Sequence, residues 1–450
     1  MSPTPDGSTR IDTLRARRIW DSRGRPTIEV DVVLAGGAIG RGVAPAGASR
    51  GSREAIERRD GGPRLGGRDV GLAIAAVQGE IAARLHGLDA LDQPAVDAAL
   101  IALDGTPDKS RLGGNALVAT SLAVLHAAAA ACGQPLWRHL AGDGPVRLPL
   151  PEIQIFGGGA HAGRRVDIQD FMVMPVGAGS FAEAMAMTAE VYAAAGALMR
   201  AAGRAQGVAD EGGHWPAFDT NEEALGMLVR AIEATGLRPG AEVGISLDVA
   251  ASEFGRGGRY RLGLEGRELD SAQLIELLGG WLAMYPILSI EDPLAEDDEA
   301  GLAEFTRRFG ARVQIVGDDC LVTSASLIAA SAGRGACNAA LIKPNQAGTV
   351  SESLAALRAA RAAGWRTVIS ARSGETEDVA IAHLAVGWNA GQLKVGSFAR
   401  GERTAKWNEC LRIEETLGAQ ARFAGRDPLA PHTDPRSGPD TDTDTDTDPT

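Results

Sequence analysis

Charged side chains stand at the ends of six short β-rich segments in the second half of the chain. The segments are VGISLD, ILSIED, VQIVGDD, AALIKPN, TVISARS and GQLKVGS. Their charged residues are Asp248, Glu291, Asp318, Lys343, Arg372 and Lys394. If the segments are parallel strands of one barrel, their carboxyl ends face the same mouth, and these side chains converge there.

Three of these residues are carboxylates in consecutive units: Asp248, Glu291 and Asp318. Three unpaired carboxylates held close together repel one another, and a divalent cation relieves that repulsion. All-oxygen ligands suit Mg²⁺. A single carboxylate could equally cap the helix that follows its strand, but the repetition in three units favours a metal site.

Lysine is rare in this chain, which uses arginine as its ordinary cation. Of the 45 basic residues only four are lysines, at positions 109, 343, 394 and 406. Arginine cannot lose its proton at workable pH, whereas lysine can. A metal ion nearby would disfavour the ammonium form and lower the pKa of Lys343 and Lys394. We therefore expect one of these two lysines to act as a base toward a carbon-bound proton.

Two further segments carry groups suited to the same chemistry. The GVADEGG turn contains Asp210 and Glu211, a carboxyl source that could donate a proton, although an ordinary acidic turn explains it equally well. The segment SARSGETED adds Arg372 and Ser373, a cation and a hydroxyl suited to binding phosphate.

The elements that position these residues fall into two predicted domains. Residues 28–34 alternate like a half-buried strand, and the segment before Val43 is its expected hairpin partner across Gly36 and Gly37. Residues 70–103 and 115–132 have helical patterns. Strands followed by helices predict an N-terminal α+β domain over residues 11–140.

The remainder of the ordered chain alternates strand and helix. Six units after residue 240, with room for two more before them, predict an α/β domain over residues 141–425, an eight-stranded (β/α)₈-type barrel of parallel strands. An open doubly wound sheet would alternate similarly, but no GxGxxG turn follows a first strand. Residues 1–10 are expected to form a flexible lead and residues 426–450 a disordered acidic tail.

Composition excludes several classes of protein. The net charge is −13, and seven aspartates against two arginines in residues 426–450 give the tail −5 of it, so a broad nucleic-acid surface is not expected. We expect no apolar run to approach the ~18 residues that span a bilayer, and the polar start MSPTPDGSTR is not expected to act as an export signal. Four cysteines without a CxxC pair fit a reducing compartment. We expect a cytoplasmic protein without a membrane or nucleic-acid partner.

The ordered chain resembles the enolase family from about Ile11 to Gly425. The motifs that carry the resemblance are DSRGRPTIEV, PAGASRGSREAIERRDG, LDGTPDKSRLGGNA, VADEGG, SIEDPLAEDD, VGDD, IKPNQAGT, SGETED and LRIEE. Enolases convert 2-phosphoglycerate to phosphoenolpyruvate with two Mg²⁺ ions per active site. They are commonly dimers or octamers, so the resemblance implies a homo-oligomer that binds a small phosphorylated carboxylate.

The resemblance also implies roles for individual residues. Asp248, Glu291 and Asp318 would bind the first Mg²⁺, and Ser49 in the GASR loop would bind a second that arrives with substrate. Lys343 would be the general base, and Glu211 would assist departure of the hydroxyl. The residues implied to line the substrate are His161, Gln169, Asp170, Arg372, Ser373 and Lys394.

Three departures from the enolase pattern lie near the implied substrate. Ala371 replaces a histidine, Asp170 replaces a glutamate, and Gly157 replaces an asparagine. They leave two enzymatic interpretations open: an enolase, and an enolase-like enzyme of phosphonate or phosphinate biosynthesis that resembles carboxyphosphonoenolpyruvate synthase. A non-catalytic binding protein is a third interpretation, against which the retention of Lys343 and Glu211 argues.

Overall fold

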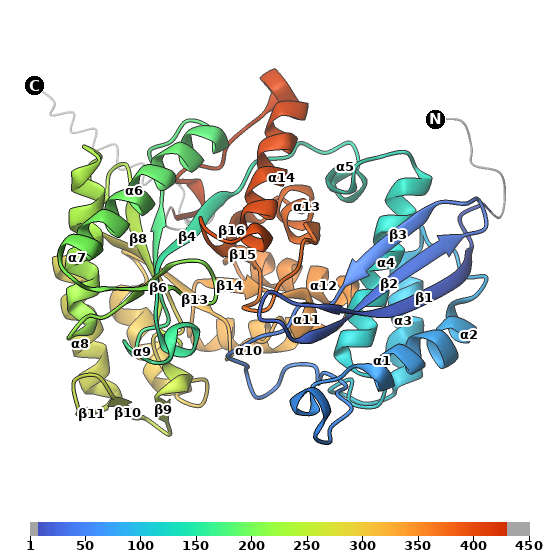
Figure 1. Ribbon diagram of the computed structural model, residues 1–450, viewed down its shortest axis with the longest axis horizontal. Helices are drawn as coiled ribbons and strands as arrows, with labels where there is room; N and C mark the ends of the chain where they lie inside the picture. Colours follow the sequence, from blue (N-terminus) through green and yellow to red (C-terminus); the bar gives the residue numbers. More distant parts are fainter. Residues whose placement is uncertain (1–7, 430–450) are drawn as a thin grey trace, which may run out of the picture.

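Three antiparallel strands begin the part of the chain that the computed structural model describes, residues 8–429. Strands β1 (Ile11–Trp20), β2 (Pro26–Leu34) and β3 (Ile39–Val43) form a sheet in that order. The hairpin expected across Gly36 and Gly37 is confirmed, because β2 pairs with β3 from Val33 opposite Ile39 onward. One face of this sheet packs on the long helix α4 (Gly114–Ala131) (Figure 1).

Of the two predicted helical stretches that follow the sheet, 115–132 is confirmed as α4, whereas 70–103 is divided into shorter helices. The helices of this region are α1 (Gly71–Ala76), the π-helical turn η2 (Val77–Ile81), α2 (Ala82–Leu85), α3 (Gln93–Asp104), α4 and α5 (Leu136–Ala141). The expected helix over 70–103 breaks after Leu85. Gly87 there has a φ of 79°, and the Asp92 side chain caps α3 by accepting from the Ala95 amide.

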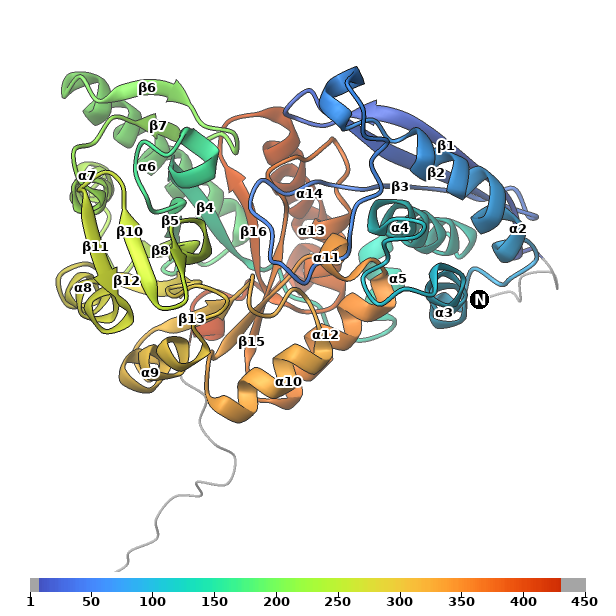
Figure 2. The same cartoon turned by 90° about the horizontal axis from the view of Figure 1, so that it is seen from below.

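The second domain is a closed barrel of eight strands, as predicted (Figure 2). Its strands are β4 (Leu150–Gly157), β5 (Asp170–Met174), β8 (Gly244–Asp248), β12 (Ile287–Glu291), β13 (Gln314–Gly317), β14 (Ala339–Ile342), β15 (Arg366–Ser370) and β16 (Gly391–Ser397). Pairing of β16 with β4 closes the barrel.

One strand runs against the prediction of an all-parallel barrel. Strand β5 is antiparallel to both of its neighbours, β4 and β8. The connection from β4 to β5 contains only the short turn η3 (Gly159–Ala162), which reverses the chain, whereas a parallel return needs a crossover helix. As a result, Asp170 begins its strand opposite Asp248, which ends its own.

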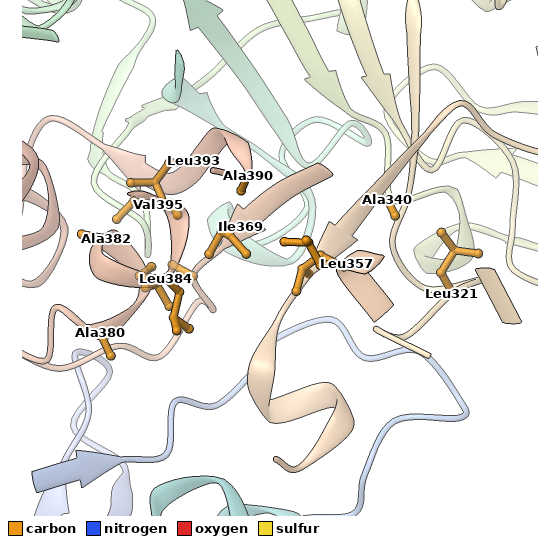
Figure 3. Close-up of a cluster of buried hydrophobic side chains, with 14 of the residues drawn as sticks. Leu321, Ala340, Leu357, Ile369, Ala380, Ala382, Leu384, Ala390, Leu393 and Val395 are labelled. Carbon is orange, nitrogen blue, oxygen red and sulfur yellow. The ribbon is translucent and has the colours of Figure 1, made fainter. Parts of the chain in front are cut away.

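Helices surround the barrel and bury its outer face. They are α6 (Phe181–Ala201), α7 (Asn221–Ala234), α8 (Ser271–Met284), α9 (Glu299–Phe309), α10 (Ala325–Arg334), α11 (Pro344–Ala347), α12 (Val350–Ala362), α13 (Ala380–Gly387) and α14 (Gly401–Leu417). In Figure 3, Ile369 of β15 and Leu393 of β16 lie among the buried side chains that include Leu357 of α12 and Leu384 of α13. This apolar layer fixes the strands whose ends carry the charged residues.

Small accessory hairpins and turns complete the described chain. The hairpins are β6 (Ala205–Val208) with β7 (His214–Pro216), and β9 (Gly255–Arg256) with β10 (Arg259–Leu262) and β11 (Arg267–Asp270). The remaining short turns are η1 (Arg64–Gly67), η4 (Ala251–Glu253), η5 (Gly418–Gln420) and η6 (Asp427–Leu429).

Both ends of the described chain make contacts that the sequence did not predict. Within the expected lead, the Thr9 carbonyl accepts a backbone hydrogen bond from the Ala90 amide, and Arg10 forms an isolated antiparallel β-bridge with Asp89. Within the expected tail, η6 buries Pro428. The rest of the predicted lead and tail, residues 1–7 and 430–450, lies outside the described residues.

Among the helices of residues 8–429, α4 alone is long and apolar enough to cross a membrane. The prediction that no apolar run approaches this length is therefore wrong for α4. Serine, threonine and histidine interrupt the apolar residues of this helix but add no charge. Its mean hydropathy is 1.4, and 83% of it is buried inside the structure. The helix is therefore the core element on which the N-terminal sheet packs.

The contact between β3 and α4 gives a stability prediction. A Cβ atom at Gly40 would lie 2.1 Å from the Ala123 carbonyl oxygen and 2.1 Å from the Ala127 nitrogen. Backbone atoms cannot yield as a side chain can, so we expect Gly40→Ala to lower the free energy of unfolding by about 3 kcal/mol. Urea denaturation followed by circular dichroism measures this change.

The matched control is Gly226→Ala in α7, where a Cβ meets nothing within 4 Å. Since alanine favours helix over glycine, this variant should gain up to about 1 kcal/mol. Equal stability of the two variants would contradict the close packing of β3 on α4.

Candidate active site

Lys394 lies at the centre of the charged residues in the barrel mouth. Because β8 pairs with β12 in register, Asp248 and Glu291 are direct neighbours. The Nζ of Lys394, on β16, lies 2.8 Å from Asp248 Oδ2 and 2.7 Å from Glu291 Oε2. Asp170 Oδ2 is 3.8 Å from the same nitrogen. One buried ammonium group thus faces three carboxylates.

Lys343 holds the third predicted metal ligand. Its Nζ donates to Asp318 Oδ2 at 2.5 Å, and the Gln346 side chain donates to the other oxygen of Asp318 at 2.8 Å. The expectation of unpaired carboxylates at the strand ends is therefore wrong. Two lysines from later strands supply positive charge to Asp248, Glu291 and Asp318, which burial requires of ionised groups.

The carboxylates and lysines shift one another's pKa. Burial and the charge of Asp248 raise the pKa of Glu291 well above its usual value. Burial alone would lower the pKa of Lys343, but the Asp318 carboxylate outweighs it and raises the pKa. The lowered lysine pKa expected from the sequence requires a cation that cancels the charge of Asp318.

The residues present fit a divalent cation. Within residues 8–429, Glu291 Oε1 and Gln169 Oε1 are buried without a hydrogen-bond partner. The Gln169 amide nitrogen donates to Asp248 Oδ2 at 3.0 Å, which places its free oxygen beside the carboxylates. A set of oxygen donors with an unused buried lone pair is what Mg²⁺ selects. The assignment of Asp248, Glu291 and Asp318 as its ligands stays a prediction. Among the described residues, ligand atoms lie within 4.8 Å of one another in two groups, Asp292 with Asp318 and Asp319, and His161 with Asp170 and Glu211.

A second group of side chains surrounds His161 in the turn between β4 and β5. Nδ1 of His161 lies 2.9 Å from Asp170 Oδ1, and Nε2 lies 3.0 Å from Ser373 Oγ and 3.6 Å from Glu211 Oε1. Burial alone would lower the pKa of His161, but Glu211 and Asp170 raise it to about 9. Burial would likewise raise the pKa of Glu211, but the facing charge of His161 lowers it. Both shifts favour a protonated imidazole that faces an ionised Glu211 at neutral pH.

Arg372 occupies the side of the mouth nearest the N-terminal domain. Its guanidinium makes two hydrogen bonds to Glu54, at 2.9 and 3.1 Å, and donates to the Ser49 carbonyl at 3.0 Å. In Figure 2 the segment that carries Ser49 and Glu54 crosses from the N-terminal sheet to the barrel beside α11. Ser49 lines the cavity at the mouth of the barrel, and its implied role toward a second Mg²⁺ stays a prediction.

Most of the predicted site residues share one small cavity. Those that line it are Ser49, His161, Gln169, Asp170, Glu211, Asp248, Lys343, Arg372, Ser373 and Lys394. Glu291 and Asp318 lie behind this wall and reach it through Lys394 and Lys343. Ala371 also lines the cavity.

Sequence reasoning missed three buried residues that support this cavity. Asp292 accepts from the backbone amides of Asp318 and Asp319, both at 2.9 Å, and so fixes the turn after β13. Glu54 lies within the motif PAGASRGSREAIERRDG, from which no role for it was predicted. Gln346 follows Lys343 by three residues and was overlooked because an amide carries no charge signal. The adjacent acids of SIEDP were the available sign for Asp292.

Comparisons with known proteins agree with this geometry. Residues 11–140 match the family model described as the enolase N-terminal domain, and residues 145–432 match the enolase C-terminal TIM barrel domain. A curated protein named Enolase from Acidothermus cellulolyticus is 49% identical over 415 residues, which cover 92% of this chain and 96% of that protein.

The environment of His161 predicts an unusual titration. Its pKa of about 9 exceeds the ordinary histidine value of 6.5, so the folded state binds this proton more tightly than the unfolded state. The resulting stabilisation is complete below pH 6.5 and is lost as the pH rises through about 9. In metal-free protein, a proton NMR titration should show a histidine signal with this midpoint that disappears in His161→Gln. A midpoint below 6.5 for the assigned signal would refute the protonated imidazole.

Proposed function

This chain belongs to the enolase family, and from that premise we propose that it catalyses the reversible dehydration of 2-phosphoglycerate to phosphoenolpyruvate. Membership of this family makes it a carbon-oxygen lyase. The observation that carries the specific reaction is the convergence of Lys343, Glu211 and Arg372 on one cavity. Together they offer a base, a carboxyl group near the departing oxygen and a cation for the phosphate.

In this proposal Lys343 removes the proton from carbon 2. That proton lies beside a carboxylate and is very weakly acidic, so the dianionic product of its removal needs positive charge nearby. Mg²⁺ bound by Asp248, Glu291 and Asp318, with a second ion at Ser49, would supply that charge and lower the pKa of Lys343. Lys394 adds a fixed ammonium group to the same region.

The His161–Glu211 pair serves the departing hydroxyl at carbon 3. Glu211 by itself is ionised here, but the protonated imidazole 3.6 Å away holds the proton that the leaving oxygen requires. The Ser373 hydroxyl accepts a hydrogen bond from the same ring nitrogen, Nε2, at 3.0 Å, and Arg372 binds the phosphate. Gln169 and Asp170 hold Asp248 and His161 in place.

We further propose that the protein acts as a cytoplasmic homo-oligomer, a dimer or an octamer. This proposal rests on its likeness to enolases. The substrate is a small phosphorylated carboxylate, which the strongly cationic guanidinium and ammonium groups of the cavity suit.

Two of the three departures from the enolase pattern have packing explanations. At Gly157 a Cβ would lie 2.6 Å from the Ala209 Cβ, so the neighbouring turn leaves no room for an asparagine. At Asp170 the short carboxylate is held by its neighbours, because Oδ1 accepts from both His161 and Gln154 and Oδ2 lies 3.8 Å from Lys394 Nζ. Ala371 has no such explanation and faces the cavity.

Replacing the base tests the proposed reaction. Arginine keeps the charge of Lys343 but cannot deprotonate, so we expect Lys343→Arg to reduce turnover at least about 10³-fold while Mg²⁺ binding changes little. Phosphoenolpyruvate formation is followed by ultraviolet absorbance, and Mg²⁺ binding by calorimetry. Exchange of the carbon 2 proton with solvent deuterium should vanish with turnover.

The control is Lys109→Arg, since Lys109 lies outside the cavity and pairs with Glu352 at 2.9 Å. It should retain activity. Persistent exchange in Lys343→Arg would assign the base to another residue, with Lys394 next to be tested, and inactivity of the parent protein would contradict the proposed reaction.

Ala371→His separates the enolase from an enzyme of phosphonate chemistry. In an enolase, the imidazole adds a donor beside the phosphate and should raise turnover of 2-phosphoglycerate about ten- to a hundredfold if the hydrogen bond forms in the transition state. If the alanine makes room for a larger phosphonate group, the same change should leave that turnover unaffected and low. High activity in the parent, unchanged by histidine, would show that Ala371 is neutral.

A further inference from the structure

Glu54 is a buried carboxylate without a role in the reaction described above. It lies in the segment between β3 and η1, with 5% of its surface exposed. Its partners come from three separate parts of the chain: the Gly51 amide at 3.1 Å, the Gln346 side chain at 3.2 Å and the Arg372 guanidinium. Each is close to a residue assigned above to metal or phosphate.

The hydrogen bonds of Arg372 show what Glu54 controls. Its Nη1 donates to Glu54 Oε2 at 2.9 Å and to Asn345 Oδ1 at 3.2 Å. Its Nη2 donates to Glu54 Oε1 at 3.1 Å and to the Ser49 carbonyl at 3.0 Å. A guanidinium group has five N–H donors, and four of them are used in this way. Within the described part of the chain, Nε is left without an acceptor.

This bidentate pairing fixes the plane of the guanidinium. A paired carboxylate holds both terminal nitrogens at once, so the group cannot rotate about its last bonds without breaking two charge-assisted hydrogen bonds. The remaining Nε–H is then aimed in one direction. Without Glu54, the same arginine would keep its charge but lose its orientation.

Glu54 also reaches the predicted metal ligands through one side chain. Gln346 Nε2 donates both to Glu54 Oε1 at 3.2 Å and to Asp318 Oδ1 at 2.8 Å. The side-chain oxygen of Gln346 accepts from the Thr323 hydroxyl at 2.6 Å, and the backbone carbonyl of Gln346 accepts from the Ala55 amide at 2.8 Å. Gln346 therefore connects the segment that carries Ser49 with Asp318.

We propose that Glu54 is a positioning residue that orients Arg372 toward the substrate phosphate and ties the Ser49 segment to the metal end of the site. This inference rests on the proposed function for the identity of the phosphorylated ligand. It predicts that Glu54 affects recognition of phosphate more strongly than the proton-transfer step, because the Lys343 nitrogen makes no contact with it in the described chain.

The test is Glu54→Gln, which keeps the shape of the side chain and removes its charge. Direct calorimetric binding of 2-phosphoglycerate in Mg²⁺ buffer should weaken at least tenfold, and KM should rise by a similar factor while kcat falls less. Glu54→Asp retains the charge with a shorter reach, so its affinity should lie between those of the parent and Glu54→Gln. If Glu54→Gln does not fold, Glu54→Asp tests the proposal in its place, and its affinity should then be lower than that of the parent.

The matched control is Glu57→Gln, three residues along the same segment. Glu57 pairs with Arg59 at 2.7 Å, so its replacement also breaks a carboxylate-arginine pair, and it should leave the affinity unchanged. Thermal unfolding of all variants separates a loss of orientation from a loss of stability.

The outcomes distinguish this inference from the proposed function. Parent-like binding and KM in Glu54→Gln, or equal weakening in Glu57→Gln, would overturn the positioning role while leaving turnover by the parent intact. Weakened binding in Glu54→Gln, with no phosphoenolpyruvate formed even by the parent, would support the positioning role and contradict the proposed reaction.

Discussion

The structure depends on keeping opposite charges buried together at the mouth of the barrel. Ionised groups lose their hydration there, so a carboxylate without a partner would cost several kcal/mol. Lys394 faces Asp248 and Glu291, Lys343 faces Asp318, and each pair comes from different strands. The barrel must therefore close in one register for the charges to balance. The buried apolar layer between strands and helices holds that register (Figure 3).

Pairing of buried opposite charges also joins the two domains. Arg372 follows the seventh barrel strand, yet its main partner, Glu54, belongs to the N-terminal domain. Backbone pairing of Ala46 with Gly374 runs beside this ion pair. The N-terminal domain is thus part of the site, since without it a buried guanidinium would lack its counterion. The segment that crosses the mouth in Figure 2 contributes Ser49 to the cavity.

Patterns within single elements were readable from the sequence, whereas relations between elements were not. Repeated strands that end in charged residues predicted the barrel and placed Asp248, Lys343 and Lys394 at its mouth. Alternation could not show that β5 runs antiparallel, because a buried strand looks the same in either direction. The alternation of strands and helices also could not predict that Lys394 contacts Asp248 and Glu291, because this contact forms only when the barrel closes. Glu54 and Gln346 were hidden for the same reason.

The three departures from the enolase pattern differ in whether neighbouring residues fit the altered side chain. Only Ala371 lacks such a neighbour in the described chain, so this position bears most directly on the choice of substrate. Gly157 and Asp170 are each matched by a neighbour, Ala209 and His161, so the altered residue and its surroundings fit together. When neighbouring residues already explain an altered side chain, the alteration gives little information about the ligand. Ala371 is buried and lines the cavity, and no neighbour in the described chain explains its small side chain. If Arg372 binds the phosphate as proposed, a difference in substrate from other enolases would arise at that end of the site, where Ala371 precedes Arg372.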